Sequence, residues 1–182
     1  MSVRSKTSER GFTLVEMLTV VAMVGVLATL AVYGVRKYIF ASKSSEALTM
    51  INSIKAAEET YKDETFAYLD VSSGAGYTPL YPSTAPADHK TAWLNPTHTD
   101  FANWRRLGVD ANGPVAFGYA VAAGAAGASI PSPSTTANLN FPTPVEPWYV
   151  IRAQADHNAD GVNSVIVASS FTREVYVEND SE

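Results

Sequence analysis

Hydrophobic residues dominate the N-terminal part of the chain. An apolar run extends from Met17 to about Val35, and Thr19 and Thr29 are its only clearly polar interruptions. Because an α-helix rises about 1.5 Å per residue, these roughly 19 residues would form a helix about 28 Å long, which matches the hydrocarbon core of a bilayer. The pattern predicts a helix that can span a membrane.

The hydrophobic pattern becomes periodic further along the chain. Between residues 41 and 62, apolar residues recur at spacings of three, four and seven; the set comprises Ala47, Ile51, Ile54 and Tyr61. This period is typical of a helix with one buried stripe. We therefore predict a single helix over residues 12–62, about 75 Å long. Its first half is apolar all round, and its second half packs on a globular domain.

Alternation with a period of two begins near residue 115. Val115, Phe117, Tyr119 and Val121 alternate with Ala116, Gly118, Ala120 and Ala122, which predicts a strand whose large-residue face packs on the helix while its small-residue face looks the other way. Residues 148–155, 164–170 and 174–178 are predicted as three further strands. Short connections between consecutive strands favour an antiparallel sheet, so the fold class is α+β.

Two irregular segments separate these elements. Residues 63–111 are interrupted by glycine and proline, with one short helix expected over residues 99–107, capped by Thr97 or Thr99. That helix would bury Phe101, Trp104 and Leu107. Residues 122–147 are rich in proline, glycine, serine and threonine, and we expect a long surface excursion that is mobile at its tip.

Composition and charge narrow the functional classes. The chain has 182 residues and a net charge of −5, which allows one globular domain besides the span. It contains no cysteine, so disulfides, thiolate metal sites and a cysteine nucleophile are excluded. An acidic chain argues against a general affinity for nucleic acid. The nearest approach to a basic patch is Lys90, Arg105 and Arg106, with Trp93 and Trp104 close in sequence.

Enzyme signatures are missing from the sequence. It has no G-x-S-x-G elbow, HExxH helix or glycine-rich phosphate loop, and His89, His98 and His157 all lie in loop-like sequence. Asp88, His89 and Lys90 can be written as a catalytic group, but an isolated surface histidine is the commoner case. We expect a protein that is not an enzyme.

The residues that lead into the apolar run form an unusual motif. A short basic leader is followed by Gly11 and Phe12, and Glu16 stands five positions after Gly11. A carboxylate near the start of a membrane span costs a few kcal/mol on insertion scales, so its presence indicates a function. The motif resembles the class III signal of type IV pilins and pseudopilins, closely over residues 11–31.

This resemblance implies a processing and assembly pathway. A prepilin peptidase would cleave between Gly11 and Phe12, the new amino group of Phe12 would be methylated, and Glu16 would take part in assembly. In a packed bundle of such helices, Glu16 can form a charge-assisted pair with the Phe12 amine of the next subunit. Removal of residues 1–11 takes away three cations and one carboxylate, which leaves a net charge of about −7.

The resemblance also implies the domain organisation and the location. Residues 1–11 would be the leader, 12–35 the membrane and filament-core helix, 36–62 its amphipathic continuation and 63–182 a pilin-like head with an antiparallel sheet. The precursor would be stored in the inner membrane and drawn by an inner-membrane assembly platform into a helical homopolymer. That polymer would be an extracellular pilus or a periplasmic pseudopilus.

The sequence departs from the usual pilin pattern at two points. Many pilins are similar to one another in a C-terminal disulfide loop, and a chain without cysteine must fix its C-terminal region by other means. Tyr33, followed by Gly34, stands where many members have a helix-kinking proline. Tyrosine keeps the backbone hydrogen bond and Gly34 loosens the helix by only about 1 kcal/mol, so a melted segment between Gly25 and Gly34 in the filament is not favoured. Close helix packing explains both glycines equally well.

Three functional interpretations are open at this point. The elaborate loops favour a pilus subunit used for adhesion, motility or DNA uptake. The first alternative is a pseudopilin of a type II secretion system. The second is a membrane-anchored extracytoplasmic binding module that does not polymerise, in which Glu16 merely lies at the membrane interface of an ordinary signal anchor.

One loop has features of a cation site. In the segment from Asp156 to Gly161, the oxygen-bearing side chains of Asp156, Asn158 and Asp160 alternate before a glycine at the sixth position, as in a calcium-binding loop. The twelfth position is Val167 where such a loop has a bidentate glutamate, and no helix is predicted on either side. The two interpretations are a bound Ca²⁺ and an Asx-rich turn that shapes a hairpin.

Overall fold

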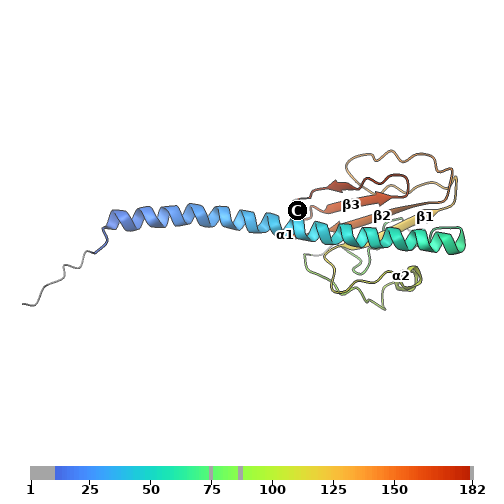
Figure 1. Ribbon diagram of the computed structural model, residues 1–182, viewed down its shortest axis with the longest axis horizontal. Coiled ribbons are helices and arrows are strands. Elements are labelled where there is room, and N and C mark those ends of the chain that lie inside the picture. Colours follow the sequence, from blue (N-terminus) through green and yellow to red (C-terminus); the bar gives the residue numbers. More distant parts are fainter. Residues whose placement is uncertain (1–10, 74–75, 86–87, 181–182) are drawn as a thin grey trace, which may run out of the picture. The chain divides into compact units, whose positions relative to one another are not determined.

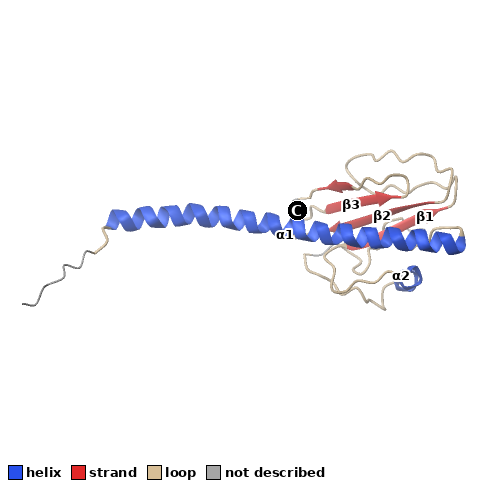
Figure 2. Ribbon diagram, in the orientation of Figure 1, coloured by secondary structure: helices blue, strands red, loops and turns tan. Residues whose placement is uncertain are grey.

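A computed structural model describes residues 11–73, 76–85 and 88–180, so most of the predicted leader lies outside the described residues. Its elements are two helices and one four-stranded sheet, an α+β arrangement as predicted (Figure 2). In chain order they are α1 (Leu14–Thr65), α2 (Phe101–Leu107), β1 (Gly118–Gly124), β2 (Trp148–Ala155), β3 (Ser164–Ser169) and β4 (Tyr176–Glu178).

The chain divides into two compact units, and the boundary between them falls within helix α1. The first unit ends at Tyr38 and the second begins at Ile39. In the first unit, all described residues are exposed, and the helix passes through Gly25, Tyr33 and Gly34 without a break. The helix begins two residues later and ends three residues later than predicted. Its continuity in a single chain agrees with the absence of a proline at position 33, whereas its state in a filament stays a prediction.

The sheet of the second unit is antiparallel throughout, in the order β1-β2-β3-β4 (Figure 1). Val121 faces Ile151 across the first pair of strands, Ile151 faces Ala168 across the second, and Ile166 faces Val177 across the third. The predicted bounds of β2 are those observed. The first strand is shorter at its start than predicted, because Val115 instead forms an isolated bridge with Thr91.

The large-residue face of the sheet packs on α1, as the alternation predicted. Phe117, Tyr119 and Val121 belong to the same buried cluster as Ile51 and Ile54 of the helix. The helix therefore contributes its apolar stripe to the main core, and burial of this stripe stabilises the packing of α1 within the second unit.

The other face of the sheet is covered as well, which the sequence did not predict. Residues 125–147, here called the long loop, fold back over it, and Ile130, Leu139 and Phe141 pack against a second buried cluster that includes Ala120 and Val150. Strand β2 is consequently buried along its whole length. The small residues of β1 have a packing reason, because a Cβ on Gly124 would lie 2.7 Å from Cζ2 of Trp148.

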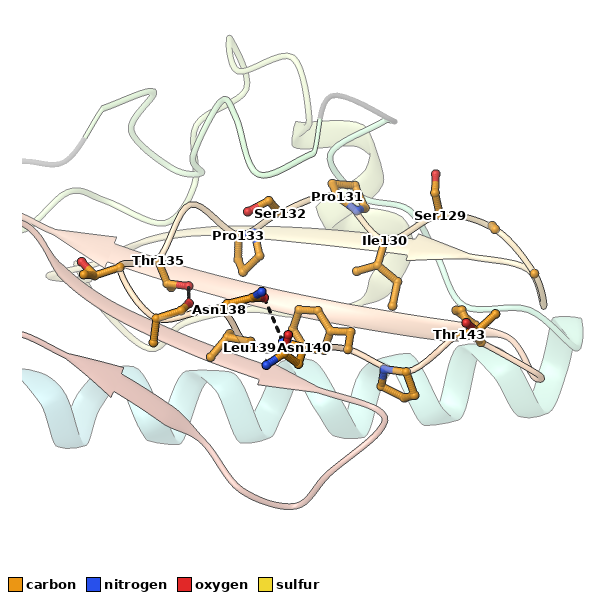
Figure 3. Close-up of a pocket in the computed structure, with 17 residues that line it drawn as sticks. Ser129, Ile130, Pro131, Ser132, Pro133, Thr135, Asn138, Leu139, Asn140 and Thr143 are labelled. Atoms are coloured by element: carbon orange, nitrogen blue, oxygen red, sulfur yellow. Dashed lines mark hydrogen bonds between the residues drawn. The ribbon is translucent and has the colours of Figure 1, made fainter.

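The long loop also encloses space of its own. A cavity of about 720 Å³ lies between the outgoing and the returning segments of the long loop. It is lined mainly by serine, threonine, asparagine and proline (Figure 3). The backbone amide of Gly127 donates to the carbonyl of Pro144 at 2.8 Å, and this hydrogen bond joins the two segments of the long loop. Within the loop, the amide of Asn140 donates to Oδ1 of Asn138 at 3.1 Å.

Polar contacts fix the C-terminal region in place of a disulfide. Strand β4 pairs with β3, and Glu178 at its end accepts hydrogen bonds from both the backbone amide and the hydroxyl of Thr136 in the long loop. The side-chain amide of Asn179 donates to the backbone carbonyl of Asn163 at 2.9 Å, and the hydroxyl of Ser44 in α1 donates to Oδ1 of Asp180 at 2.8 Å. Residues 178–180 are thereby hydrogen-bonded to the long loop, to the segment before β3 and to α1.

Helix α2 is shorter than predicted and its predicted caps are wrong. Its N-cap residue is Asp100, which makes no side-chain capping hydrogen bond. The hydroxyl of Thr97 donates instead to Oδ1 of Asn95 at 2.8 Å, so it is engaged in the preceding turn. As predicted, the helix buries Trp104 and Leu107, whereas Phe101 is only partly buried.

Candidate processing and assembly site

The predicted cleavage point lies immediately before α1. Gly11, Phe12 and Thr13 are not helical, and Phe12 is 83% exposed. A peptide bond between Gly11 and Phe12 is therefore free of helical hydrogen bonding and of packing against the described residues. These are the conditions under which a protease can bind the backbone.

Glu16 forms a reciprocal cap with Thr13 at the start of α1. The backbone amide and the hydroxyl of Thr13 both donate to Oε2 of Glu16, at 2.8 and 2.6 Å. The amide of Glu16 donates in return to the hydroxyl of Thr13 at 3.3 Å. This is the capping box, in which an N-cap threonine and a glutamate three residues later satisfy each other's backbone donors.

The cap gives Glu16 a partner within its own chain. Sequence reasoning identified Glu16 but missed Thr13, although a threonine three residues before a glutamate, ahead of an apolar run, is the sequence signature of this motif. A carboxylate has about four acceptor positions, and in the described residues Thr13 is bonded to Oε2. Oε1 is left with capacity for a further donor.

The apolar half of α1 has no cover in the described residues. It is long and apolar enough to cross a membrane, and none of that stretch is buried. Exposed side chains lie all around it, among them Leu18, Val24, Leu27 and Leu30. An apolar surface of this extent requires a bilayer or other protein around it.

The candidate cation loop is closed by its own hydrogen bonds. Gly161 donates its amide to Oδ2 of Asp156 at 3.0 Å, and Val162 donates its amide to Oδ1 of Asp160 at 2.7 Å. The side-chain amide of Asn158 donates to the other oxygen of Asp160 at 2.9 Å. In the described residues, no three His, Cys, Asp or Glu side chains are grouped so as to hold a metal ion. The geometry is that of consecutive Asx turns, and Ca²⁺ binding by this loop stays a prediction.

Comparison with known proteins identifies the N-terminal segment. The family model described as the prokaryotic N-terminal methylation motif matches residues 6–32, which include Gly11, Phe12 and Glu16. The N-terminal segment of the chain is similar to that of type IV pilins. Its long apolar helix and antiparallel sheet form a pilin-like fold.

The curated relatives are pilins and fimbrial proteins. The type IV major pilin protein PilA of Myxococcus xanthus is 36% identical over 76 residues, which are 42% of this chain and 34% of the relative. The type IV major fimbrial protein FimA of Dichelobacter nodosus is 33% identical over 92 residues, which are 46% of this chain and 58% of the relative. The chain thus spans between about a third and three fifths of the length of these two relatives. No solved structure was found to match it.

The histidines of this pilin-like chain have different environments. His89 is exposed and pairs with Asp88 at 2.9 Å, as expected for a surface residue. His98 and His157 are buried, which the loop-like sequence around them did not predict. Nε2 of His98 lies 2.8 Å from the carbonyl oxygen of Leu80. The ring of His157 lies between Phe40 and Phe117, and burial, with Lys43 nearby, lowers its pKa to about 4.

Each basic residue of the candidate nucleic-acid patch interacts with a side chain of the same protein. Lys90 forms an ion pair with Glu46 at 2.5 Å, Arg105 lies over the ring of Phe101, and Arg106 lies over the ring of Tyr61. The nearby tryptophans, Trp93 and Trp104, are buried in the main core. They are not exposed rings on which bases can stack.

Proposed function

We propose that this protein is a structural subunit of a type IV pilus. The supporting observation is the coincidence, at one helix start, of an exposed non-helical Gly11–Phe12 bond, a capped Glu16 and an uncovered apolar helix. Each feature suits one stage of the pathway. The bond suits cleavage by a prepilin peptidase, the free amine of Phe12 suits methylation, and the helix suits storage in the inner membrane followed by packing in a filament.

Assembly would then exchange the lipid around α1 for the same helix of other subunits. Cleavage converts Phe12 into a residue with a cationic amine, and Glu16 of a neighbouring subunit offers the complementary charge in a site shielded from water. Subunits that contact one another by different surfaces extend without closing, so the product is a helical polymer. An inner-membrane platform would supply the subunits, and the head would face the solvent.

The role of Glu16 in this proposal depends on its charge, and Thr13 supports it. The capping box fixes the carboxylate at the first turn of the helix, within reach of an incoming amine, before any second subunit arrives. In the precursor, Thr13 is a hydrogen-bond partner for the Glu16 carboxylate within the same chain. This hydrogen bonding also lowers the free-energy cost of placing the carboxylate near the membrane.

Deletion and complementation test the proposal. Cells that lack the protein should lose surface fibres in electron micrographs, and the wild-type gene should restore them. Loss of protein secretion with fibres intact would instead assign the chain to a type II secretion pseudopilus. Unchanged fibres and unchanged secretion would contradict both assignments and favour an anchored binding module.

A further inference from the structure

A groove runs along the second unit between α1 and the turn that follows β3. It is an open hollow of about 590 Å³, lined by residues of α1, including Asn52, Lys55 and Glu59, and by residues 169–173, including Arg173. Phe171, which is partly exposed, contributes aromatic surface to the same groove, and the buried Tyr149 lies at its base. It therefore combines hydrogen-bond donors, two cations and an apolar wall.

Neither cation of this groove forms an ion pair in the described residues, although the carboxylate of Glu59 also lines the groove. Lys55 is partly buried, and that burial lowers the pKa of its ammonium group. Neither Lys55 nor Arg173 forms an ion pair or a side-chain hydrogen bond within the ranges that the structure describes. Glu59, the carboxylate in the groove, accepts hydrogen bonds from the hydroxyl of Tyr68 at 3.0 and 3.1 Å. A partly desolvated, unpaired cation is unfavourable until an anion reaches it.

The C-terminal end of α1 has the complementary chemistry. Asp63 and Glu64 are both exposed and lie in the last turn, where the negative end of the helix dipole disfavours carboxylates. Phe66 follows directly, with its side chain 86% exposed and its backbone in the left-handed region at φ 61°. A bulky residue rarely adopts that conformation. The acidic end of α1 thus combines carboxylates at the unfavourable end of the helix dipole, an exposed aromatic ring and an unfavourable backbone conformation. Unfavourable local features of this kind are expected at functional surfaces.

We propose that the acidic end of α1 (Asp63, Glu64 and Phe66) in one subunit docks in the groove of Lys55 and Arg173 in the next subunit. The inference rests on the proposed function and adds the contact between heads to it. The two surfaces differ, so the contact is heterologous and repeats along a polymer without closing. The carboxylates meet the two unpaired cations, and Phe171 provides an apolar counterpart for Phe66.

Charge reversal in the full-length chain tests the contact. Lys55→Glu, and separately Asp63→Lys with Glu64→Lys, should each lower the yield of fibres by about tenfold or more, because like charges then meet at the interface. The combined variant restores opposite charges and should recover most of the yield. Lys43→Glu, which makes the same change on the same helix outside the groove, should assemble normally. Normal fibre yields from both reversed variants would overturn the proposal.

Cross-linking gives a second test, which the absence of cysteine makes specific. Lys55→Cys combined with Glu64→Cys should give a ladder of covalent multimers when assembled fibres are treated with a bismaleimide. Neither single variant should give a ladder, because the contact joins two different surfaces and each single variant carries a cysteine on only one of them. Normal fibres without a ladder would remove the groove contact and leave the pilus assignment standing. A wild-type chain that forms no fibres would overturn the pilus assignment and the contact together.

Discussion

Glu58 offers the most quantitative prediction from this structure. It lies on the inner face of α1 and is fully buried. Oε2 accepts the backbone amide of Leu69 at 2.9 Å, whereas Oε1 has no hydrogen-bond partner in the described residues. Burial, opposed by the hydrogen bond from Leu69 and reinforced by the charges of Glu59 and Asp70, raises the pKa of Glu58 from 4.5 to about 8.

The raised pKa makes the stability of the head depend on pH. Below about pH 4.5, Glu58 is protonated in both the folded and the unfolded chain, and its contribution is at its most favourable. Between about 4.5 and 8, the unfolded chain ionises while the folded chain holds its proton, so stability falls as pH rises. Each pH unit is worth about 1.4 kcal/mol, which amounts to about 3 kcal/mol at pH 7.

Glu58→Gln should therefore stabilise the head at neutral pH. Glutamine is neutral in both states and retains an oxygen to accept the amide of Leu69. We expect a gain of about 3 kcal/mol at pH 7 that shrinks to near zero at pH 4.5. Glu64→Gln, at an exposed carboxylate of the same helix, serves as the control and should change stability by less than about 0.5 kcal/mol.

Urea unfolding of the full-length chain in detergent, followed by tryptophan fluorescence at several pH values, measures this difference. The buried rings of Trp93, Trp104 and Trp148 report the loss of the core. A gain that is the same at pH 5 and pH 8, or a variant that is less stable than wild type throughout, would refute the reasoning that Glu58 is held protonated by its burial.

Three further predictions follow from the same structure. Glu16→Gln keeps an acceptor for the amide of Thr13 and removes the charge, so the protein should reach the membrane yet form few fibres in electron micrographs; normal piliation would contradict a role for the charge. Gly124→Ala should destabilise the head by about 1–3 kcal/mol in urea unfolding, because the added methyl group overlaps Trp148, whereas Gly113→Ala meets open space and should be near neutral. Calorimetric titration of the full-length chain with Ca²⁺ tests Asp156, Asn158 and Asp160 as ligands: binding heat that Asp160→Ala abolishes supports them, and no heat removes the site.

The sequence predicted those parts of the fold whose signal is local and periodic. The apolar run, the helical stripe from Ala47 to Tyr61 and the alternation at Phe117, Tyr119 and Val121 each identify an element and its buried face. Such patterns are repeated at every turn or every second residue, so single exceptions do not hide them.

The packing of the long loop was missed for the opposite reason. Ile130, Leu139 and Phe141 stand far apart among prolines and polar residues, and only the folded chain brings them onto one sheet face. The burial of His98 and His157 likewise depends on residues distant in sequence, such as Leu80 and Phe117.

At the candidate site, sequence and structure contribute different parts. The motif of Gly11, Phe12 and Glu16 is readable from the chain alone, because its residues are adjacent and their types are unusual ahead of an apolar run. The structure adds Thr13 as the partner of Glu16 and the unpaired state of Lys55 and Arg173. Ion pairing is a property of three-dimensional neighbours, so no spacing along the chain reveals it.

Intact-mass spectrometry of the protein from purified surface fibres tests the central claim most directly. We predict a chain that begins at Phe12 and carries one additional methyl group on its amino terminus. A chain that still begins at Met1 would contradict the account, and so would failure to find this protein in the fibres at all.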